Sequence, residues 1–453
     1  MENKTEIKFY SGTRKIGGTV ISIEYGDNRI ILDFGRGITP LGFAADNISR
    51  DIIKKYLRLG ILPKIDGFYS ENDILDEMKI LPLEKYGKIT KVFISHLHLD
   101  HMQHMGLIDN NIEVYMTEES LKLYSILEKI GEGVIGERAY NIIHYGETLK
   151  FGDICVTSLR VDHDVMGATA YFVKTPDLTV LYSGDLRLSG SHPEWTLNMA
   201  HEAEKLGVNL LILESTTVGN EAMQVEASKE APSGEKNLTL RIVEELKEKN
   251  EIAFFNIYHR NIDRIMEFYE ASKKLKRKLV LELATAYIAK NTIDINDFYV
   301  IEEEKLELNK FNKEVIDFYN NAKKLCLENI NLEGYEYLVQ NSFDNIIKLL
   351  DIDFGKAVYI HSNGTPLGDY DPSYNGMKEF LRKLNIEYKY IGSTGHATPK
   401  DLKYLAEIIK PNWFIPIHGF YPENIHINCG IRFLPEEGKT YVFNSQFTVH
   451  NAQ

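Results

Sequence analysis

Three of the 14 histidines in this chain lie within one short run, His96-Leu-His-Leu-Asp-His101. The run follows Val92–Ser95, a short apolar segment that predicts a buried strand. A loop after such a strand can turn His96 and His98 toward one centre while Asp100 and His101 face another. Imidazole and carboxylate groups are ligands of zinc in sites that keep a position open for water. We therefore expect a site for zinc or a similar ion here, rather than a histidine-rich surface loop.

Two downstream residues extend this set. His163 lies just past the predicted strand Ile154–Val161, and Asp185 ends the segment Leu181–Asp185. An acidic side chain at the end of a buried strand is costly unless it is paired or binds a metal. A structural role is the alternative for each residue taken singly. In this order, and at these strand ends, both are candidate metal ligands.

Three further residues, which come later in the chain, also lie at predicted strand ends: Glu214, His396 and His418. The strands concerned are Asn209–Glu214, Glu387–Ile391 and Trp413–His418. A capping glutamate and two structural histidines are the alternative when each residue is considered alone. Their common placement on either side of a long middle segment adds them to the candidate set.

The elements that must position these residues fall into two strand-rich parts and a middle part of different texture. The first part also has strand patterns at Thr19–Tyr25, Arg29–Phe34, Ala168–Lys174 and Leu178–Ser183, and helical patterns at Ala44–Leu57 and Glu118–Gly131. The middle part has helical patterns at Asn237–Lys249, Arg260–Lys274 and Glu304–Leu325, with strands at Ile252–Tyr258 and Lys356–His361. A mainly helical block between strand-rich parts predicts a discontinuous first domain, residues 1–216 and 387–453, with a second domain, residues 217–386, inserted in it.

Composition limits the class of protein. A chain of 453 residues exceeds the usual size of a single core, which favours two domains. Its three isolated cysteines, Cys155, Cys326 and Cys429, argue against a disulfide framework and against a cysteine-based zinc site. No apolar run reaches the ~18 residues of a membrane span. The first residues lack the apolar stretch of a signal peptide, so we expect no membrane contact and a cytoplasmic location.

The net charge of −14 is unusual for a protein whose whole surface binds nucleic acid. It does not exclude a polyanionic substrate, because bound metal ions can make a deep site locally positive. For the net charge alone, simple solubility is the preferred interpretation.

The strand-end residues resemble the motifs of the metallo-β-lactamase fold, which implies an α/β protein with an αβ/βα sandwich and a site at the sheet edges. The resemblance assigns His96, His98 and His163 to one divalent metal ion, Asp100 and His101 to a second, and Asp185 as the bridge. Two cations roughly 3.5–4 Å apart polarise a phosphoryl or carbonyl oxygen and acidify a bridging water. His98 favours hydrolysis over oxygen chemistry, because the similar flavodiiron oxidoreductases usually carry Glu there.

Glu214, His396 and His418 match the three signature motifs of the β-CASP nucleases, on either side of an insertion of suitable size. Over about residues 1–440 the chain resembles the ribonuclease J family. The resemblance implies an inserted β-CASP α/β domain and a zinc-dependent hydrolase that cleaves phosphodiester bonds in single-stranded RNA, in exonucleolytic or endonucleolytic mode or both. The RNA would lie in the cleft between the domains, and the metal would be zinc, with manganese or magnesium as alternatives.

The same resemblance gives each motif residue a role. His418 becomes a further ligand of the second ion, and His396 lies near the leaving oxygen as a general acid. Glu214 is the carboxylate that orients or charges a site histidine. Together with the metal ligands Asp100 and Asp185, these residues form the expected catalytic set.

The chain departs from the ribonuclease J pattern around His396. Gly392 and Thr394 stand where the family has a phosphate-contacting His and Ser, so we expect a weaker dependence on a 5′-monophosphate. Residues whose side chains or backbone amides could compensate are His361, Ser362, Ser393, Thr394 and Gly395. Phe420 replaces the family's Glu after His-Gly. Because the sequence ends at Gln453, we expect no counterpart of the family's C-terminal domain, which assists dimerisation. A homodimer is a candidate assembly.

Two other functions remain open. A DNA nuclease of the same superfamily would resemble the Artemis branch, but that branch tends to lack a histidine at the last motif, so His418 favours RNA. A non-catalytic β-CASP scaffold would only bind partners, but such paralogues lose metal ligands, and every expected ligand is present here. A small-ester or thioester hydrolase would not need the insertion.

Two basic features also have two interpretations. The run Lys273-Lys-Leu-Lys-Arg-Lys278 could contact a phosphate backbone, or it could be the solvated end of a helix. Arg260 and Arg264, one helical turn apart, could line the cleft or have a structural role.

Overall fold

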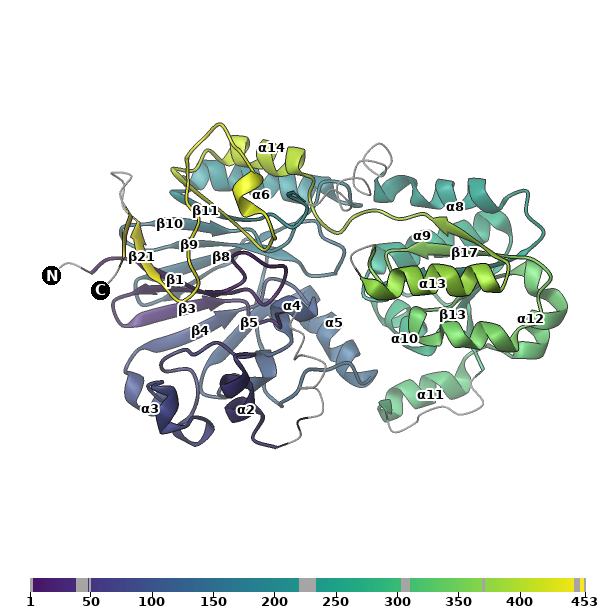
Figure 1. The fold of residues 1–453 in the computed structure, drawn as a ribbon, viewed down its shortest axis with the longest axis horizontal. Helices are drawn as coiled ribbons and strands as arrows, with labels where there is room; N and C mark the ends of the chain where they lie inside the picture. Colours follow the sequence, from purple (N-terminus) through teal and green to yellow (C-terminus); the bar gives the residue numbers. More distant parts are fainter. Residues whose placement is uncertain are drawn as a thin grey trace.

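The computed structural model describes residues 3–37, 48, 50–219, 234–302, 310–368, 371–443 and 449–451. Within these ranges the strands form three sheets, of eight, seven and seven strands. Figure 1 shows two lobes, with the first two sheets in one lobe and the third sheet in the other.

The first sheet combines an antiparallel half with a parallel half. In spatial order its strands are β22 (Val449–Asn451), β21 (Thr440–Phe443), β1 (Glu6–Ser11), β2 (Val20–Tyr25), β3 (Asn28–Leu32), β4 (Ile89–Phe93), β5 (Glu113–Thr117) and β6 (Asn141–Ile143). Strands β3 to β6 are parallel, so their carboxyl ends meet at one edge. The histidine run begins just after β4, at this edge.

The second sheet has the same mixed character. In spatial order its strands are β20 (Ile431–Arg432), β19 (Trp413–Ile417), β11 (Leu210–Glu214), β10 (Thr179–Tyr182), β9 (Thr169–Lys174), β8 (Ile154–Arg160) and β7 (Thr148–Phe151). Strands β10, β11 and β19 are parallel neighbours, which brings Asp185, Glu214 and His418 to one edge of the sheet.

The two sheets pack face to face. Ile21 and Phe93 of the first sheet share a buried cluster with Val173 and Ile212 of the second. Helices α6 (Pro193–Leu206) and α14 (Pro399–Ile409) cover the outer face of the second sheet, and α5 (Glu118–Lys129) packs on the first. The predicted αβ/βα sandwich is confirmed.

The third sheet is parallel throughout. In spatial order its strands are β15 (Lys324–Leu325), β14 (Tyr299–Ile301), β13 (Lys278–Leu281), β16 (Tyr337–Gln340), β12 (Ile252–Ile257), β17 (Ala357–Ser362) and β18 (Ile386–Tyr390). Helices α8 (Leu238–Leu246), α9 (Ile262–Leu275) and α10 (Leu283–Thr292) pack on one face, and α13 (Pro372–Lys383) packs on the other. Coverage of both faces is typical of parallel sheets.

The remaining helices are short. They are α2 (Ile52–Leu59), α3 (Leu83–Tyr86), α4 (Leu99–Met102), α11 (Lys313–Asn321) and α12 (Leu327–Glu333). Of the predicted helix Ala44–Leu57, only the part from Ile52 appears as helix, and residues 44–47 and 49 lie outside the described residues.

The middle part is the expected α/β unit, but its sequence pattern showed only some of its strands. Strands β13, β14, β15 and β16 were not predicted, and the predicted helical stretch Glu304–Leu325 contains α11 and ends in β15, while its residues 304–309 lie outside the described ranges. These strands span two to four residues each, and buried parallel strands lack the alternation that marks a strand in a sequence.

The predicted domain boundary at 386/387 falls within β18, which pairs with β17. We therefore propose that the inserted domain extends to about Tyr390, with its first boundary after Thr216 as predicted.

Candidate metal centre

The candidate residues converge on loops that leave the sandwich strands. His96 to His101 follow β4, His163 follows β8, and Asp185 follows β10. His418 follows β19, while His396 lies between β18 of the third sheet and α14. Strands from both sheets of the sandwich thus present their side chains to one region.

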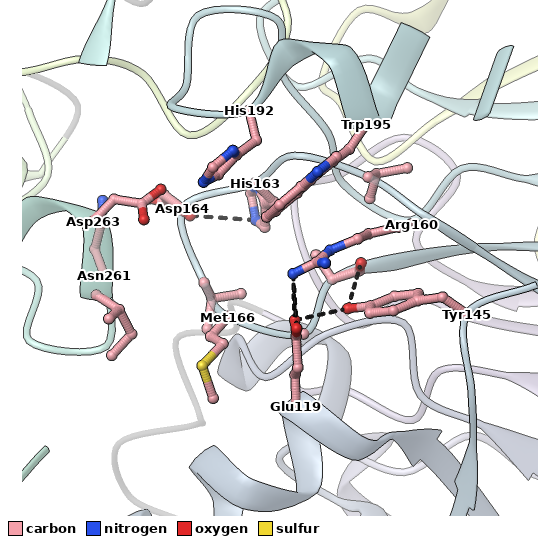
Figure 2. A pocket seen from close by; sticks show the side chains of 15 residues that line it. Glu119, Tyr145, Arg160, His163, Asp164, Met166, His192, Trp195, Asn261 and Asp263 are labelled. Carbon is pink, nitrogen blue, oxygen red and sulfur yellow. Dashed lines mark hydrogen bonds and ion pairs between the residues drawn. The ribbon is translucent and has the colours of Figure 1, made fainter. Parts of the chain in front are cut away.

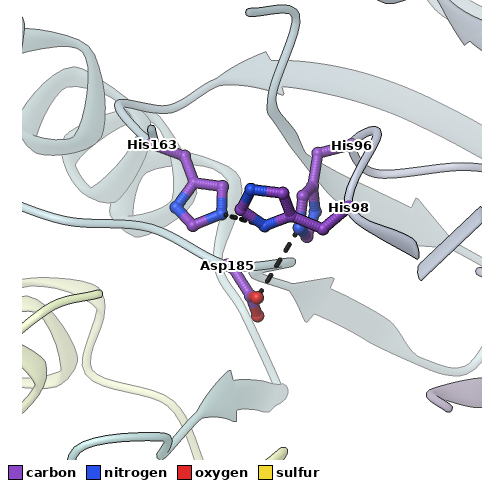
Figure 3. Close-up of side chains that lie close together, drawn as sticks. All are labelled: His96, His98, His163 and Asp185. Atoms are coloured by element: carbon purple, nitrogen blue, oxygen red, sulfur yellow. Dashed lines mark hydrogen bonds and ion pairs between the residues drawn. The ribbon is translucent and has the colours of Figure 1, made fainter. Parts of the chain in front are cut away.

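His96, His98, His163 and Asp185 form the first group, and Figure 3 shows their side chains pointing toward one another. Their candidate ligand atoms all lie within 4.8 Å of one another. His98 Nδ1 lies 3.1 Å from His163 Nε2, and His96 Nε2 lies 3.6 Å from Asp185 Oδ2. This is the grouping expected for one ion.

Asp100, His101 and His418 form the second group. His418 Nε2 lies 2.9 Å from His101 Nε2 and 3.1 Å from Asp100 Oδ2. Asp185 Oδ2 reaches this group too, at 3.2 Å from His101 Nε2 and 3.8 Å from His418 Nε2. One carboxylate oxygen therefore lies between the two groups, where a bridging ligand was expected.

The outer nitrogens of the histidines are held by other groups. Nδ1 of His96 contacts Ser95 Oγ at 3.0 Å, and Nδ1 of His163 contacts the Gly395 carbonyl at 2.6 Å. Nδ1 of His418 contacts Thr216 Oγ1 at 3.1 Å. Such contacts fix the ring orientation and leave Nε2 for a metal ion.

His98 is turned the other way. Its Nε2 contacts Asp164 Oδ1 at 3.2 Å, so Nδ1 is the atom that faces His163.

The donor set is compatible with a binuclear metal site. His96 Nε2 and Asp185 Oδ1 are buried and have no hydrogen-bond partner among the described residues, although buried polar atoms are normally bonded. Burial, with His101 and His163 nearby, lowers the pKa of His96 well below its usual value, so its ring stays neutral, as a metal ligand must be. Cations at the two groups would satisfy these atoms.

His396 and Glu214 form a pair beside the two groups. His396 Nδ1 lies 3.0 Å from Glu214 Oε2 and 3.9 Å from Asp185 Oδ2. Glu214 is buried and also accepts a hydrogen bond from the Leu186 amide at 3.1 Å. Burial lowers the pKa of His396, but Glu214 and then Asp185 raise it to about 10. The predicted contact between Glu214 and a site histidine is present.

Two acidic residues at the site were not singled out from the sequence. Asp33 accepts hydrogen bonds from the Ser95 amide at 2.6 Å and contacts His101 Nδ1 at 2.8 Å. Asp164 lies against His98 and His163. Asp33 ends a buried strand, the same signal that identified Asp185, and Asp164 directly follows His163, so both could have been found.

Arg260 reaches the histidine run from the third-sheet lobe. Its Nη1 donates to the Leu97 carbonyl, between two ligand histidines, at 3.0 Å, and its Nη2 donates to Glu132 at 3.0 Å. Burial alone would raise the pKa of Glu132, but His259 and Arg260 lower it to about 2. Arg260 is buried, and each of its three guanidinium nitrogens donates to Glu132 or to the Leu97 carbonyl, which favours the structural interpretation.

Arg264 donates in a similar way to a backbone carbonyl of the loop that carries His396. It pairs with buried Glu235 at 2.5 Å and donates to the Ser393 carbonyl at 3.1 Å. Arg187, from the sandwich, contacts Glu235 at 3.3 Å and the Thr394 carbonyl at 3.4 Å. Arg264 is fully buried, so it also has the structural role and does not line a cleft.

The residues predicted to contact the substrate lie in two environments. His361, Ser362 and Ser393 are buried, and the hydroxyl of Ser362 is bonded to Arg264 and to the Ile391 carbonyl. Thr394 and Gly395 are partly exposed. Substrate contact stays a proposal only for Thr394 and Gly395, because the other side chains face the interior.

The basic run is engaged at several positions. Lys273 lies 3.7 Å from Glu270, and Lys278 lies 2.8 Å from Glu336. Arg277 donates to the carbonyls of Lys249 and Glu251. These contacts favour the structural interpretation of the run.

Among the described helices, none is long and apolar enough to cross a membrane.

Comparison with known proteins gives matches for both lobes. The family described as the β-lactamase superfamily domain matches residues 68–280. Ribonuclease J of Mycoplasma genitalium is 25% identical over 94% of this chain and 71% of that protein. Ribonuclease J of Pyrococcus abyssi is 22% identical over 91% of this chain and 90% of that protein. A solved structure of a protein of unknown function from Enterococcus faecalis V583 is 28% identical and has a TM-score of 0.78, over 97% of this chain and all of that chain.

These matches agree with the motifs. The metallo-β-lactamase fold and the resemblance to ribonuclease J, both predicted from the sequence, are confirmed.

Proposed function

We propose that this ribonuclease J-like protein of the metallo-β-lactamase fold is a metal-dependent phosphodiesterase that cleaves single-stranded RNA. One observation carries the proposal: two groups of ligand atoms share Asp185 Oδ2, beside a histidine held by buried Glu214. This arrangement suits displacement at a phosphodiester, which needs charge neutralisation on one side and a proton for the leaving oxygen on the other.

Two divalent cations, when bound, would neutralise charge on the phosphoryl oxygens and make hydroxide available at neutral pH. The residues that would hold them are His96, His98 and His163 for one, Asp100, His101 and His418 for the other, and Asp185 for both. Five imidazoles in the set favour zinc, because magnesium and manganese prefer oxygen ligands.

His396 would supply the proton. Because its Nδ1 is bonded to Glu214, Nε2 is the ring atom left to donate to the leaving oxygen. The buried carboxylate of Glu214 fixes the ring and stabilises its charged form. A general acid in this position typically contributes ~10²–10⁴ in rate.

The RNA strand would lie between the two lobes, and its 5′ end would be recognised weakly. A Cβ at Gly392 would lie 2.1 Å from Asn363 Oδ1, so no larger side chain fits there without a shift. The donor that the ribonuclease J pattern places at this position is therefore missing. We propose that a 5′-monophosphate changes the rate less than tenfold, which corresponds to less than about 1.4 kcal/mol.

A DNA nuclease is the second candidate, and a non-catalytic scaffold is the third. The contact of His418 with Asp100 and His101 supports the RNA branch over the DNA branch, as argued from the sequence. The complete donor set supports an enzyme over a scaffold. A homodimer and a cytoplasmic location remain predictions.

The test uses end-labelled RNA and DNA oligomers of one sequence, incubated with protein loaded with zinc or manganese. We expect RNA to be cleaved at least tenfold faster than DNA, and the product ladder to report exonucleolytic or endonucleolytic mode. Faster cleavage of DNA would favour the second candidate. Tight RNA binding without cleavage by any metal-loaded sample would favour the scaffold.

A further inference from the structure

A cavity of ≈ 180 Å³ lies beside the first ligand group and is bounded by both lobes. The sandwich contributes the loop that contains His163 and Asp164, together with Arg160 and the start of α6; the other lobe contributes the start of α9, with Asp263. Figure 2 shows these groups around a central space. The volume is smaller than the roughly 300–1,000 Å³ of sites for drug-sized ligands, and it suits a single heterocycle.

One wall of the cavity is a column of flat side chains. The His192 ring stacks on Trp195, with centroids 3.9 Å apart and an interplanar angle of 10°. The Arg160 guanidinium lies 3.5 Å from the Trp195 ring centroid and 4.8 Å from that of Tyr145. Glu119 fixes Arg160 with two hydrogen bonds, at 2.7 and 2.9 Å. Glu119 therefore holds the column in place at the end formed by Arg160 (Figure 2).

The column ends at His192, whose side chain is partly exposed. Trp195 covers one face of His192, and the His192 side chain is still 40% exposed. A partly exposed imidazole, fixed by a stacked indole and by a contact of its Nδ1 with Glu194 Oε1 at 3.1 Å, offers a platform on which a planar group can stack.

Charge selects the kind of ligand. Among the described lining residues the one guanidinium, that of Arg160, is paired with Glu119. The two further carboxylates are paired as well: Asp263 lies 3.6 Å from Arg187 Nη2, and Asp164 contacts His98 and His163. The described lining residues therefore leave no unpaired guanidinium or ammonium group for a phosphate, whereas a neutral base needs none. The carboxylates can also accept hydrogen bonds from base N–H groups.

The position of the cavity fixes which base is concerned. His163 lines the cavity and also belongs to the first ligand group, and Asp164 contacts His98. A base in the cavity would therefore belong to a nucleotide next to the phosphate that is cleaved.

We propose that this cavity is a nucleobase subsite, in which one base of the substrate strand stacks on His192 at the end of the Trp195–Arg160 column. The inference rests on the proposed function for its substrate class, and it adds a specificity-determining contact outside the ligand groups. A stacked base contributes to binding whatever its identity, so the subsite reads the presence of a base more than its sequence.

The variants for the test are His192→Ala, which removes the platform, and His192→Phe, which retains a flat ring. His192 makes no side-chain cap to α6, so neither change removes a helix cap. His201→Ala is the matched control, since His201 lies on the same helix, is exposed and is absent from the cavity lining.

The first measurement is kcat/KM for a set of RNA oligomers in which an abasic site is moved one position at a time past the cleaved bond. In the wild-type protein we expect one position where the abasic site lowers kcat/KM by roughly tenfold to a hundredfold. That penalty should vanish in His192→Ala and persist in His192→Phe and His201→Ala. An equal penalty in His192→Ala would overturn the subsite.

The second measurement separates this inference from the nuclease assignment. A cleavage-resistant 2′-O-methyl RNA with 2-aminopurine at that position, or at each position in turn if no cleavage occurs, is titrated with metal-loaded protein. Fluorescence quenching that depends on His192 supports the subsite even if the protein cleaves nothing. Cleavage without His192-dependent quenching would leave the nuclease standing and reject the subsite, and absence of RNA binding would reject both.

Discussion

The two lobes contribute differently to the metal centre. Every side chain in the two ligand groups comes from the part of the chain that forms the sandwich, on loops that follow its strands. The lobe of the third sheet sends Arg260 to the backbone of one of those loops, at Leu97, and Arg264 to the loop that carries His396, at Ser393. The sandwich thus carries the candidate metal ligands, and the other lobe supports one of their loops and the loop of His396.

Arg260 and Arg264 differ in how deeply their carboxylate partners are buried. Arg264 and its partner Glu235 are both fully buried, whereas Glu132, the partner of Arg260, is 22% exposed. A buried ion pair that loses one partner leaves an uncompensated charge, while a partly exposed one is relieved by water. The comparison predicts that substitutions have graded effects on activity and stability. The effect should be largest for a metal ligand, smaller for the buried pair of Glu235 and Arg264, and smaller again for the partly exposed pair of Glu132 and Arg260.

The largest effect is expected at Asp185. Asp185→Asn removes the charge that both ligand groups share, so metal content should fall below two ions per chain. RNA cleavage should fall by about a thousandfold or more. Elemental analysis of the purified variant, together with initial rates on labelled RNA, checks both. A variant that keeps its rate with a single tightly bound ion would remove Asp185 from the centre.

The next effect is expected at His396. His396→Ala should lower the cleavage rate by ~10²–10⁴, as for loss of a general acid. It should retain both ions, because His396 belongs to neither of the two groups assigned to them; its candidate ligand atom lies in a third group, with Asp185 and Glu214. Rate and metal content are measured on the same sample. If the ions are lost together with the activity, His396 is a ligand and not the proton donor.

The third-largest effect is expected at the buried Glu235, which pairs with Arg264 and Arg187. Glu235→Gln strands Arg264 and Arg187 in the interior and should lower the free energy of unfolding by ~3–5 kcal/mol. A displaced Ser393–His396 loop should also reduce kcat by about tenfold to a hundredfold. Urea unfolding and steady-state kinetics measure these effects, and Glu248→Gln, at an exposed position, is the control. An unchanged kcat would separate the ion pair from the site.

The fourth effect is expected at the partly exposed Glu132, whose contribution to the free energy of unfolding depends on pH. The pKa of Glu132 is lowered in the folded protein to about 2 from the ordinary 4.5, so its contribution is fully present above about 4.5 and is lost as the pH falls toward 2. Glu132→Gln should therefore cost about 1.5–3 kcal/mol at pH 7 and less at pH 4. Urea unfolding of both proteins at the two pH values gives the comparison. A difference that grows as the pH falls would contradict this account of Glu132.

The smallest effect is expected at the basic run. Lys274→Ala should change KM for RNA by less than about twofold, since a solvated charge at a helix end contributes little. Binding measured across a range of salt concentrations provides the check. A clear loss of affinity, together with a smaller salt slope, would show that the run contacts the phosphate backbone after all.

The sequence predicted the sandwich and its ligand loops well because the signals are local. A histidine or carboxylate directly after an apolar strand is visible in the sequence, and parallel neighbouring strands then bring such ends together. Asp33 satisfied the same rule and was overlooked. The supporting arginines could not be placed this way, because Arg264 meets Ser393 across 129 positions of the chain with no local pattern to announce it.

Four strands of the third sheet and the burial of His361 and Ser393 were not predicted, for a related reason. Strands β13 to β16 are too short to show a period, and their burial depends on helices that are distant in the sequence. His361 and Ser393 lie at strand ends, as predicted, but neighbouring elements cover them. Position in a strand is a local property, whereas exposure is set by the packing of the whole lobe.

The central claim is that two ions held by the sandwich loops enable cleavage of RNA. Metal-depleted protein can be titrated with zinc or manganese while bound metal and the cleavage of labelled RNA are followed together. The account predicts that the rate is near zero without metal and reaches its plateau at two ions per chain. Full activity in metal-free protein, or a plateau at one ion, would contradict it.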